Sequence, residues 1–450
     1  MTSQSTTSTH NNTSHISSSV AEEKPVRNKS QLELLAPAGG MDQLRYAVYY
    51  GANAVYLGAD QFGLRARANN FSLDQIPLAV EFAHDNGVAV HVTCNALMQQ
   101  EDLSSLPHYL EALDAAGVDA IIVSDLGALS LVKKHAPRVD IHISTQASCA
   151  NAESARIYYE LGAKRIVCAR EMSLEEIACM RASVPQDLEL EIFVHGAMCM
   201  AVSGRCLISD YVTGRSANKG NCSQPCRWKY QLIEEHRPDT PFSLEQDEGG
   251  SYIMNAQDMN MLAHLDAIAA AGVDSIKIEG RNKKAFYVAT VVNAYRQVLD
   301  GAPLENFAPE LEKISHRPYS TGFYFGKATQ ASNQEGYLQE YVHVATVEES
   351  YNNAALPSSS KEGSWQSLIN AREDYSVRIR CHNRIVPGDT IEIVSPHAPI
   401  RTAEVSHILW QTPSGTWVES DAANRAMEQY LIQLPFECHA HDLIRRKIDD

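Results

Sequence analysis

The sequence of 450 residues lacks any unbroken apolar run long enough for a membrane span or a secretory signal. It also lacks an excess of basic residues, because 38 lysines and arginines stand against 55 aspartates and glutamates, giving a formal net charge of −17. A chain this acidic binds nucleic acid only through a local basic patch. No Gly-x-Ser-x-Gly or His-Glu-x-x-His motif marks a peptidase site. The residues themselves therefore give no support to a membrane protein or a protease.

Length and composition divide the chain into several regions. At 450 residues it exceeds a usual single hydrophobic core, so more than one domain is expected. Residues 1–30 are rich in Ser, Thr and Asn without an apolar run, which predicts a disordered tail. We assign a catalytic domain to 31–300, a connector to 301–349, a flexible insertion to 350–374 and a C-terminal domain to 375–450. The absence of a clear targeting segment favours a cytoplasmic location.

A repeated pattern dominates the region before Asp300. Helix-like segments end in Gly-Ala or Gly-Val, and a β-rich run follows at once, as in 51–57, 117–123, 162–168 and 272–278. Glycine suits the left-handed residue that ends a helix, and a continuous apolar strand suits a parallel sheet covered on both faces. About eight such strands predict an α/β fold with a (β/α)8 TIM-like barrel.

The C-terminal region has a different pattern. Residues 376–380 and 390–394 alternate between polar and apolar, and a Pro-Gly turn lies between them. Alternation interrupted by turn residues predicts antiparallel strands. We expect a small β-barrel domain, a class that often binds RNA.

Polar residues follow several of the predicted barrel strands, where the catalytic groups of such barrels lie. Arginine and lysine suit a substrate with two carboxylates or phosphates, a histidine can transfer protons near neutral pH, and a glutamate can act as a base. Each of these residues also has a structural alternative, such as an ordinary ion pair or a histidine satisfied by backbone. The candidates are Arg65, Arg67, Gln146, Arg170, Glu171, His195, Lys277, Glu279 and Arg281.

Four of the ten cysteines fall within a Gly-, Ser- and Asn-rich loop over residues 197–230: Cys199, Cys206, Cys222 and Cys226. Their intervals of six, fifteen and three residues do not form the two tight pairs usual for structural zinc. An iron–sulfur cluster is narrowly favoured, while zinc and simple buried thiols remain open. Basic residues that could face phosphates, or balance a negatively charged cluster, flank these thiols: Arg205, Arg215, Lys219, Arg227 and Lys229.

The stretch from Glu191 to Ser209 reads Glu-x-Phe-x-x-Gly-Ala-x-Cys-x-x-x-x-Gly-x-Cys-x-Ile-Ser. Together with residues 33–39, 252–258, 276–281 and 316–323, it resembles the collagenase-like peptidase family of unknown catalytic type. The resemblance is strongest to the branch that hydroxylates tRNA.

That resemblance implies prephenate-dependent conversion of wobble uridine to 5-hydroxyuridine, with prephenate as cosubstrate. It also implies a 4Fe–4S cluster on the four cysteines, with tRNA and the iron–sulfur assembly machinery as partners. Prephenate is a dicarboxylate, which agrees with a site rich in arginine and lysine. Two alternatives stand beside it: a collagenase-like peptidase, and a subunit of an iron–sulfur hydroxylase acting on a small aromatic ring, as in ubiquinone synthesis.

Overall fold

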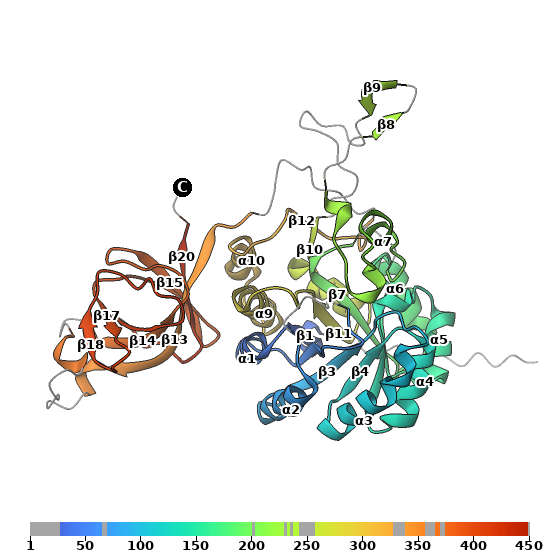
Figure 1. Cartoon of the computed structure of the whole chain (residues 1–450), viewed down its shortest axis with the longest axis horizontal. Coiled ribbons are helices and arrows are strands. Elements are labelled where there is room, and N and C mark those ends of the chain that lie inside the picture. The colour runs from blue at the N-terminus through green and yellow to red at the C-terminus, as the bar shows by residue number, and fades with distance from the viewer. Residues whose placement is uncertain are drawn as a thin grey trace, which may run out of the picture.

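The structure is a computed structural model that describes residues 28–64, 70–199, 203–228, 232–234, 237–242, 257–326, 338–355, 365–369 and 374–448. In Figure 1 a barrel surrounded by helices stands beside a second body made of strands. Most of the predicted tail lies outside the described residues. Its last part does not fit that prediction, because Lys29–Gln31 form a 3₁₀ turn that Asn28 and Gln31 cap reciprocally.

The predicted TIM-like barrel is confirmed. Its eight strands follow one another in parallel, and β11 pairs with both β7 and β1, which closes the barrel. Strands β2 and β4 are buried at every residue because side chains fill the barrel on one face and helices cover the other. The barrel strands are β1 (Glu33–Ala38), β2 (Ala54–Gly58), β3 (Ala89–Cys94), β4 (Ala120–Val123), β5 (Asp140–Ile143), β6 (Arg165–Val167), β7 (Glu189–Ala197) and β11 (Ser275–Ile278).

Helices connect these strands on the outside of the barrel (Figure 1). They are α1 (Met41–Tyr49), α2 (Ile76–Asp85), α3 (Leu106–Ala116), α4 (Leu126–His135), α5 (Ala152–Glu160), α6 (Leu174–Ser183), α8 (Leu265–Ala270) and α9 (Ala285–Leu299). The predicted glycine at the end of a helix is confirmed at Gly117, which has φ +76° after α3. No helix within the described ranges is both apolar enough and long enough to cross a bilayer.

The barrel strand β7 is extended by two further strands that sequence reasoning missed. Strand β10 (Asp258–Asn260) pairs antiparallel with the end of β7, and β12 (Tyr319–Ser320) pairs parallel with β10. The register of β11 against β7 shifts between Lys277 and Ile278, so Lys277 pairs with Phe193 but Ile278 pairs with His195. This irregularity changes which side chains face the barrel interior beyond that point.

The predicted antiparallel C-terminal domain is confirmed as an eight-stranded sheet in the order β16-β15-β20-β13-β14-β19-β17-β18. Its strands curl around a separate apolar core. They are β13 (Tyr341–Asn352), β14 (Tyr375–Cys381), β15 (Thr390–Ser395), β16 (Ala398–Glu404), β17 (Ile408–Gln411), β18 (Trp417–Glu419), β19 (Gln429–Leu434) and β20 (Leu443–Lys447).

Strand β13 lies in the stretch assigned to the connector and the flexible insertion, so the sheet begins before residue 375. Its register shifts twice, between His343 and Ala345 and between Val347 and Glu349. These shifts remove the simple alternation by which a strand is recognised in sequence. The connector itself contains α10 (Leu304–Glu312), which packs against α9.

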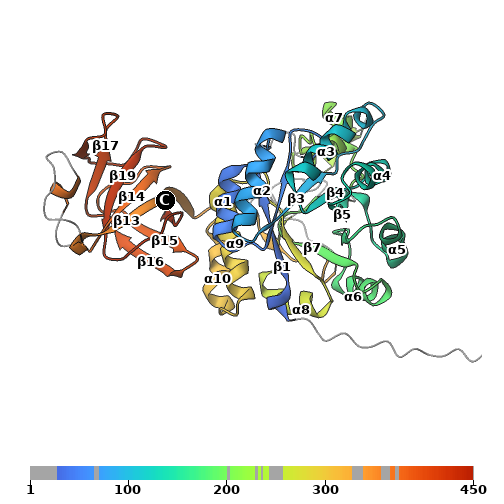
Figure 2. The ribbon, with the colours of Figure 1, turned by 90° about the horizontal axis from the view of Figure 1, so that it is seen from below.

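The C-terminal sheet packs against the outside of the barrel at α1, α9 and α10 (Figure 2). Tyr50, directly after α1, donates a hydrogen bond of 2.7 Å to the carbonyl oxygen of Val394. The buried Arg445 on β20 lies 2.6 Å from Glu310 of α10 and 2.6 Å from Glu392 of its own sheet. Buried hydrogen bonds and a shared arginine therefore join the two bodies.

Candidate functional site

A pocket opens at the carboxyl ends of the barrel strands, where the rim residues were predicted to lie. It encloses about 440 Å³, counting its open mouth. Its polar and charged lining residues are Tyr56, Thr93, Asn95, Ser144, Thr145, Gln146, Lys277, Glu279 and Arg281, and its apolar ones are Leu64, Ile122, Val167 and Phe193. A small ligand with both anionic groups and an apolar part suits this lining.

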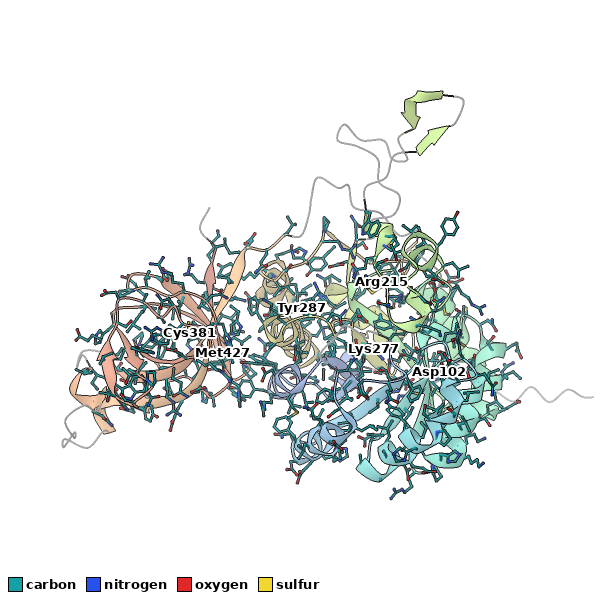
Figure 3. All side chains as sticks on the ribbon, in the orientation of Figure 1. Asp102, Arg215, Lys277, Tyr287, Cys381 and Met427 are labelled. Carbon is teal, nitrogen blue, oxygen red and sulfur yellow. The ribbon has the colours of Figure 1, made fainter. Side chains whose placement is uncertain are left out.

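Two cationic side chains lie on one wall of the pocket. Lys277, labelled within the barrel in Figure 3, places its Nζ 4.3 Å from the centre of the Tyr56 ring and 2.9 Å from Glu191 Oε1. Arg281 donates from Nη1 to Thr93 Oγ1 at 3.1 Å. Gly58 makes room for this guanidinium, because a Cβ at residue 58 would overlap it. The pocket wall is thus shaped around Arg281.

Below the pocket, charged residues are paired with one another. Arg165 Nη1 lies 2.6 Å from Glu33 Oε1 and 3.1 Å from Glu191 Oε2, and its Nη2 lies 2.7 Å from Glu189 Oε2. Burial raises the pKa of Glu191, but Lys277 and Arg165 together hold it below its ordinary value. Glu191 therefore stays ionised and connects Lys277 to the network beneath it.

His195 lies within β7 rather than after it, and it does not line the pocket. It is buried among the rings of Tyr287, Tyr295 and Tyr319. Burial lowers the pKa of His195 to about 3, so the imidazole is neutral. Its proposed proton transfer stays a prediction, and its surroundings are those of a structural histidine.

Arg170 and Glu171 hold neighbouring segments in place at the rim. The guanidinium of Arg170 lies 5.5 Å from the centre of the Phe193 ring and donates to the carbonyl oxygen of Ala197 at 3.5 Å. Glu171 accepts hydrogen bonds from Ser203 N at 2.9 Å and Ser203 Oγ at 3.1 Å. The two residues do not pair with each other. Arg170 contacts β7, the strand before the cysteine loop, and Glu171 contacts the start of that loop.

The cysteine loop, residues 199 and 203–228, is folded over the rim by its own polar contacts. Asn218 exchanges hydrogen bonds with the backbone of Cys206, at 3.4 and 3.0 Å. Ser209 and Thr213 on α7 (Ile208–Thr213) bond to Ser223 at 2.9 and 2.8 Å. The described part of this loop holds only short helices, in agreement with the proline at 225 and the turn at Gly220.

Cys199 is exposed, and Cys206, Cys222 and Cys226 are half-buried. Four thiols on one loop are the donor type that an iron–sulfur cluster requires. In the arrangement seen here, however, no three His, Cys, Asp or Glu side chains of the described residues are placed to hold a metal ion. The four thiols are thus suitable ligands for the cluster, but in this arrangement they do not lie close enough together to bind it.

Of the predicted basic residues, Arg205 and Lys219 are exposed and Arg215 is half-buried. Arg215 donates to Asn221 Oδ1 at 3.2 and 3.0 Å, and Lys219 bonds to Gln99. The side chain of Arg227 and all of Lys229 lie outside the described residues, as do Arg65 and Arg67.

Comparison with known proteins places this site in a family. The profile of peptidase family U32 matches residues 39–334, which is more than half of the chain. The chain belongs to peptidase family U32.

Three relatives of this U32 chain differ in their names and in how much of it they cover. The tRNA hydroxylation protein P1 of Bacillus subtilis is 34% identical over 423 residues, 92% of this chain and 94% of that protein. The 23S rRNA 5-hydroxycytidine C2501 synthase of Escherichia coli is 37% identical over 306 residues, 64% of this chain and 44% of that protein. The collagenase of Porphyromonas gingivalis is 31% identical over 318 residues, 67% of this chain and 75% of that protein.

The pocket of this U32 chain brings together four of the predicted site residues: Gln146, Lys277, Glu279 and Arg281. Among the predicted residues that the structure describes, Arg170, Glu171 and His195 do not line it. Sequence reasoning missed Tyr56, Thr93, Asn95 and Phe193, which do. Thr93 and Asn95 lie at or just after the carboxyl end of β3, so their position could have indicated them. Tyr56 and Phe193 lie inside β2 and β7, where position gave no such signal.

Proposed function

We propose that this chain is an RNA-modifying hydroxylase that converts the wobble uridine of tRNA to 5-hydroxyuridine in the cytoplasm. The observation that carries the proposal is the 92% coverage of the chain by the tRNA hydroxylation protein P1, which reaches into the C-terminal sheet. The rRNA synthase among the relatives is also named for hydroxylation at position 5 of a pyrimidine. Two relatives thus share a reaction class on different RNA substrates.

Prephenate is the proposed cosubstrate. Lys277 and Arg281 offer two cationic groups to its two carboxylates, and the planar guanidinium of Arg281 can grip one of them with two hydrogen bonds. Phe193 and Ile122 offer apolar surface to its ring. Glu279, also in the lining, is the candidate proton acceptor. The roles of these residues are to bind and orient the small molecule and to accept a proton.

We also propose that Cys199, Cys206, Cys222 and Cys226 bind a 4Fe–4S cluster delivered by the iron–sulfur assembly machinery. Such a cluster supplies a redox-active centre when bound. Because the described arrangement does not bring three of the thiols together, binding requires the cysteine loop to rearrange. Ser203, held by Glu171, fixes one end of that loop against the rim.

Nucleoside mass spectrometry of tRNA tests the proposed reaction. Cells lacking the gene would be complemented with the wild type, Arg281→Ala, Cys222→Ala or Cys179→Ala, and grown without oxygen to remove oxygen-dependent routes. We expect 5-hydroxyuridine derivatives with the wild type and with Cys179→Ala, whose exposed cysteine lies on α6, and a loss with the other two. Unchanged 5-hydroxyuridine in the deletion strain would contradict the tRNA assignment.

Iron and sulfide analysis of anaerobically purified protein tests the cluster separately. We expect Cys222→Ala to lose bound iron and Cys179→Ala to retain it. Cleavage of denatured collagen by metal-free protein would instead support a peptidase. A missing hydroxyl on a quinone ring in the deletion strain would support a subunit of an iron–sulfur hydroxylase that acts on a small aromatic ring.

A further inference from the structure

The cysteine loop exposes large apolar side chains that a stable fold does not require. Tyr211 is 92% exposed, Leu207 is 73% exposed and Trp228 is 44% exposed. We call these three residues the aromatic face. Tyr211 belongs to α7, and Trp228 follows the 3₁₀ turn η6 (Pro225–Arg227), which packs against α7. Clustered exposed apolar groups on neighbouring segments indicate an interaction surface.

Basic residues outnumber carboxylates on the loop that carries the aromatic face, where Asp210 of α7 is the one acidic residue among the described positions 203–228. Arg205, Arg215 and Lys219 lie on the same loop, and no described carboxylate forms an ion pair with any of them. Arg215 and Lys219 bond only to the neutral amides of Asn221 and Gln99. Their charge is therefore uncompensated locally, although the chain as a whole carries a formal charge of −17. A polyanion is attracted to such a locally basic region.

The aromatic face begins close to the wall of the pocket. Ser148 Oγ donates to the carbonyl oxygen of Ser203, and a Cβ at residue 204 would overlap the carbonyl oxygen of Gln146. Gln146 lines the pocket, and Leu207 follows Gly204 by only three residues. An RNA chain with one residue in the pocket would therefore have neighbouring residues near Leu207, the first residue of the aromatic face.

We propose that the aromatic face binds unpaired RNA next to the target nucleotide, with Tyr211 and Trp228 stacking on bases and Arg205, Arg215 and Lys219 contacting phosphates. This inference rests on the proposed function. Single-stranded RNA presents base faces that exposed aromatic rings can stack on, whereas a duplex hides them. The combination of bare rings and unpaired cations favours RNA over a protein partner, whose interface core is depleted in charge.

Fluorescence anisotropy with a labelled single-stranded RNA of about twelve nucleotides, and with the matching duplex, tests the inference. We expect Tyr211→Ala and Trp228→Ala each to weaken single-strand binding about tenfold or more. Tyr211→Phe keeps the ring and should bind like the wild type. Phe325→Ala is the matched control, because Phe325 is 55% exposed on another part of the molecule. Thermal unfolding would establish that each variant is folded.

The inference is overturned if folded Tyr211→Ala and Trp228→Ala bind the single strand as tightly as the wild type. It is also overturned if Tyr211→Phe or Phe325→Ala weakens binding as much as they do, or if the duplex binds as well as the single strand. Tyr211-dependent RNA binding without 5-hydroxyuridine formation in cells would support the aromatic face and contradict the proposed reaction. Formation of 5-hydroxyuridine in cells, with RNA binding unaltered in both alanine variants, would support the proposed reaction and contradict the aromatic face.

Discussion

At the amino ends of the barrel strands, Arg165 is surrounded by Glu33, Glu189 and Glu191, whereas at the carboxyl ends Lys277 and Arg281 face a pocket. Both ends of the barrel interior hold buried charges. Those at the amino ends satisfy one another, whereas at the carboxyl ends Lys277, although it also pairs with Glu191, and Arg281 border space that a ligand can fill. The difference indicates that the first group stabilises the barrel and the second serves binding. Substitutions at Arg165, Glu33 and Arg281 test this difference, and a substitution at Glu171 tests the rim beside the pocket.

The largest expected effect is on stability, from Arg165→Met. Removing the guanidinium leaves three carboxylates close together, one of them fully buried and two half-buried, which should cost about 3–5 kcal/mol in the free energy of unfolding. Urea unfolding followed by circular dichroism measures it. Arg45→Ala is the control, since this arginine and its partner Asp42 are both largely exposed, and a change below about 1 kcal/mol is expected. An unaltered midpoint for Arg165→Met would refute the stabilising role.

A second effect concerns pH. Burial raises the pKa of Glu33, but Arg165 lowers it further, to about 2 from an ordinary 4.5. Because the folded pKa is the lower one, the stabilisation is complete above pH 4.5 and is lost as the pH falls toward 2. Glu33→Gln should therefore show a weaker loss of melting temperature across this interval than the wild type. Glu153→Gln, at an exposed pair on α5, should keep the wild-type slope. Identical slopes for all three proteins would rule out this linkage.

A third effect should appear in catalysis rather than in stability. Arg281→Ala removes a bidentate group from the pocket and should lower kcat/KM for prephenate, the proposed cosubstrate, about a hundredfold. Arg281→Lys keeps the charge without the fork, so its kcat/KM should lie between those of the wild type and the alanine variant. Steady-state kinetics with tRNA measures it. Equal activity of the alanine and wild-type proteins would remove Arg281 from the binding site.

The smallest expected effect is local. Glu171→Ala removes the acceptor for Ser203 N and Oγ, so amide hydrogen exchange in residues 203–210 should accelerate about tenfold while the melting temperature changes little. Glu171→Gln retains an acceptor oxygen and should exchange more slowly than the alanine variant. Exchange that is the same in all three proteins would mean that Glu171 does not anchor the loop.

Much of the architecture could be read from the sequence because it rests on local signals. Glycine at helix ends and continuous apolar strands predicted the barrel, and the strand ends predicted Gln146, Glu279 and Arg281 at one rim. These signals need only neighbouring residues. The same holds for the alternating strands β14 and β15.

What could not be read depends on register. The pairing of Lys277 with Glu191 exists only because β11 lies beside β7 in the closed barrel. The shift after Lys277 accompanies the placement of His195 among tyrosines instead of in the pocket. Likewise, the polar sequence at Glu171 and Ser203 gave no sign that the two would meet across thirty-two positions. Long-range contacts and strand irregularities leave little trace in local composition.

Arg445, fully buried where the C-terminal sheet meets Glu310 of the barrel's outer layer, makes the two bodies mutually dependent. The hydrogen bond from the Tyr50 hydroxyl to Val394 has the same effect. If the two bodies were separated, each would expose polar groups that are buried and paired in the whole chain. The barrel helices therefore fix the position of the C-terminal sheet, and the two bodies do not move independently. In a homologue without the C-terminal sheet, positions 50 and 310 would be exposed to solvent. We therefore expect polar side chains at both positions there.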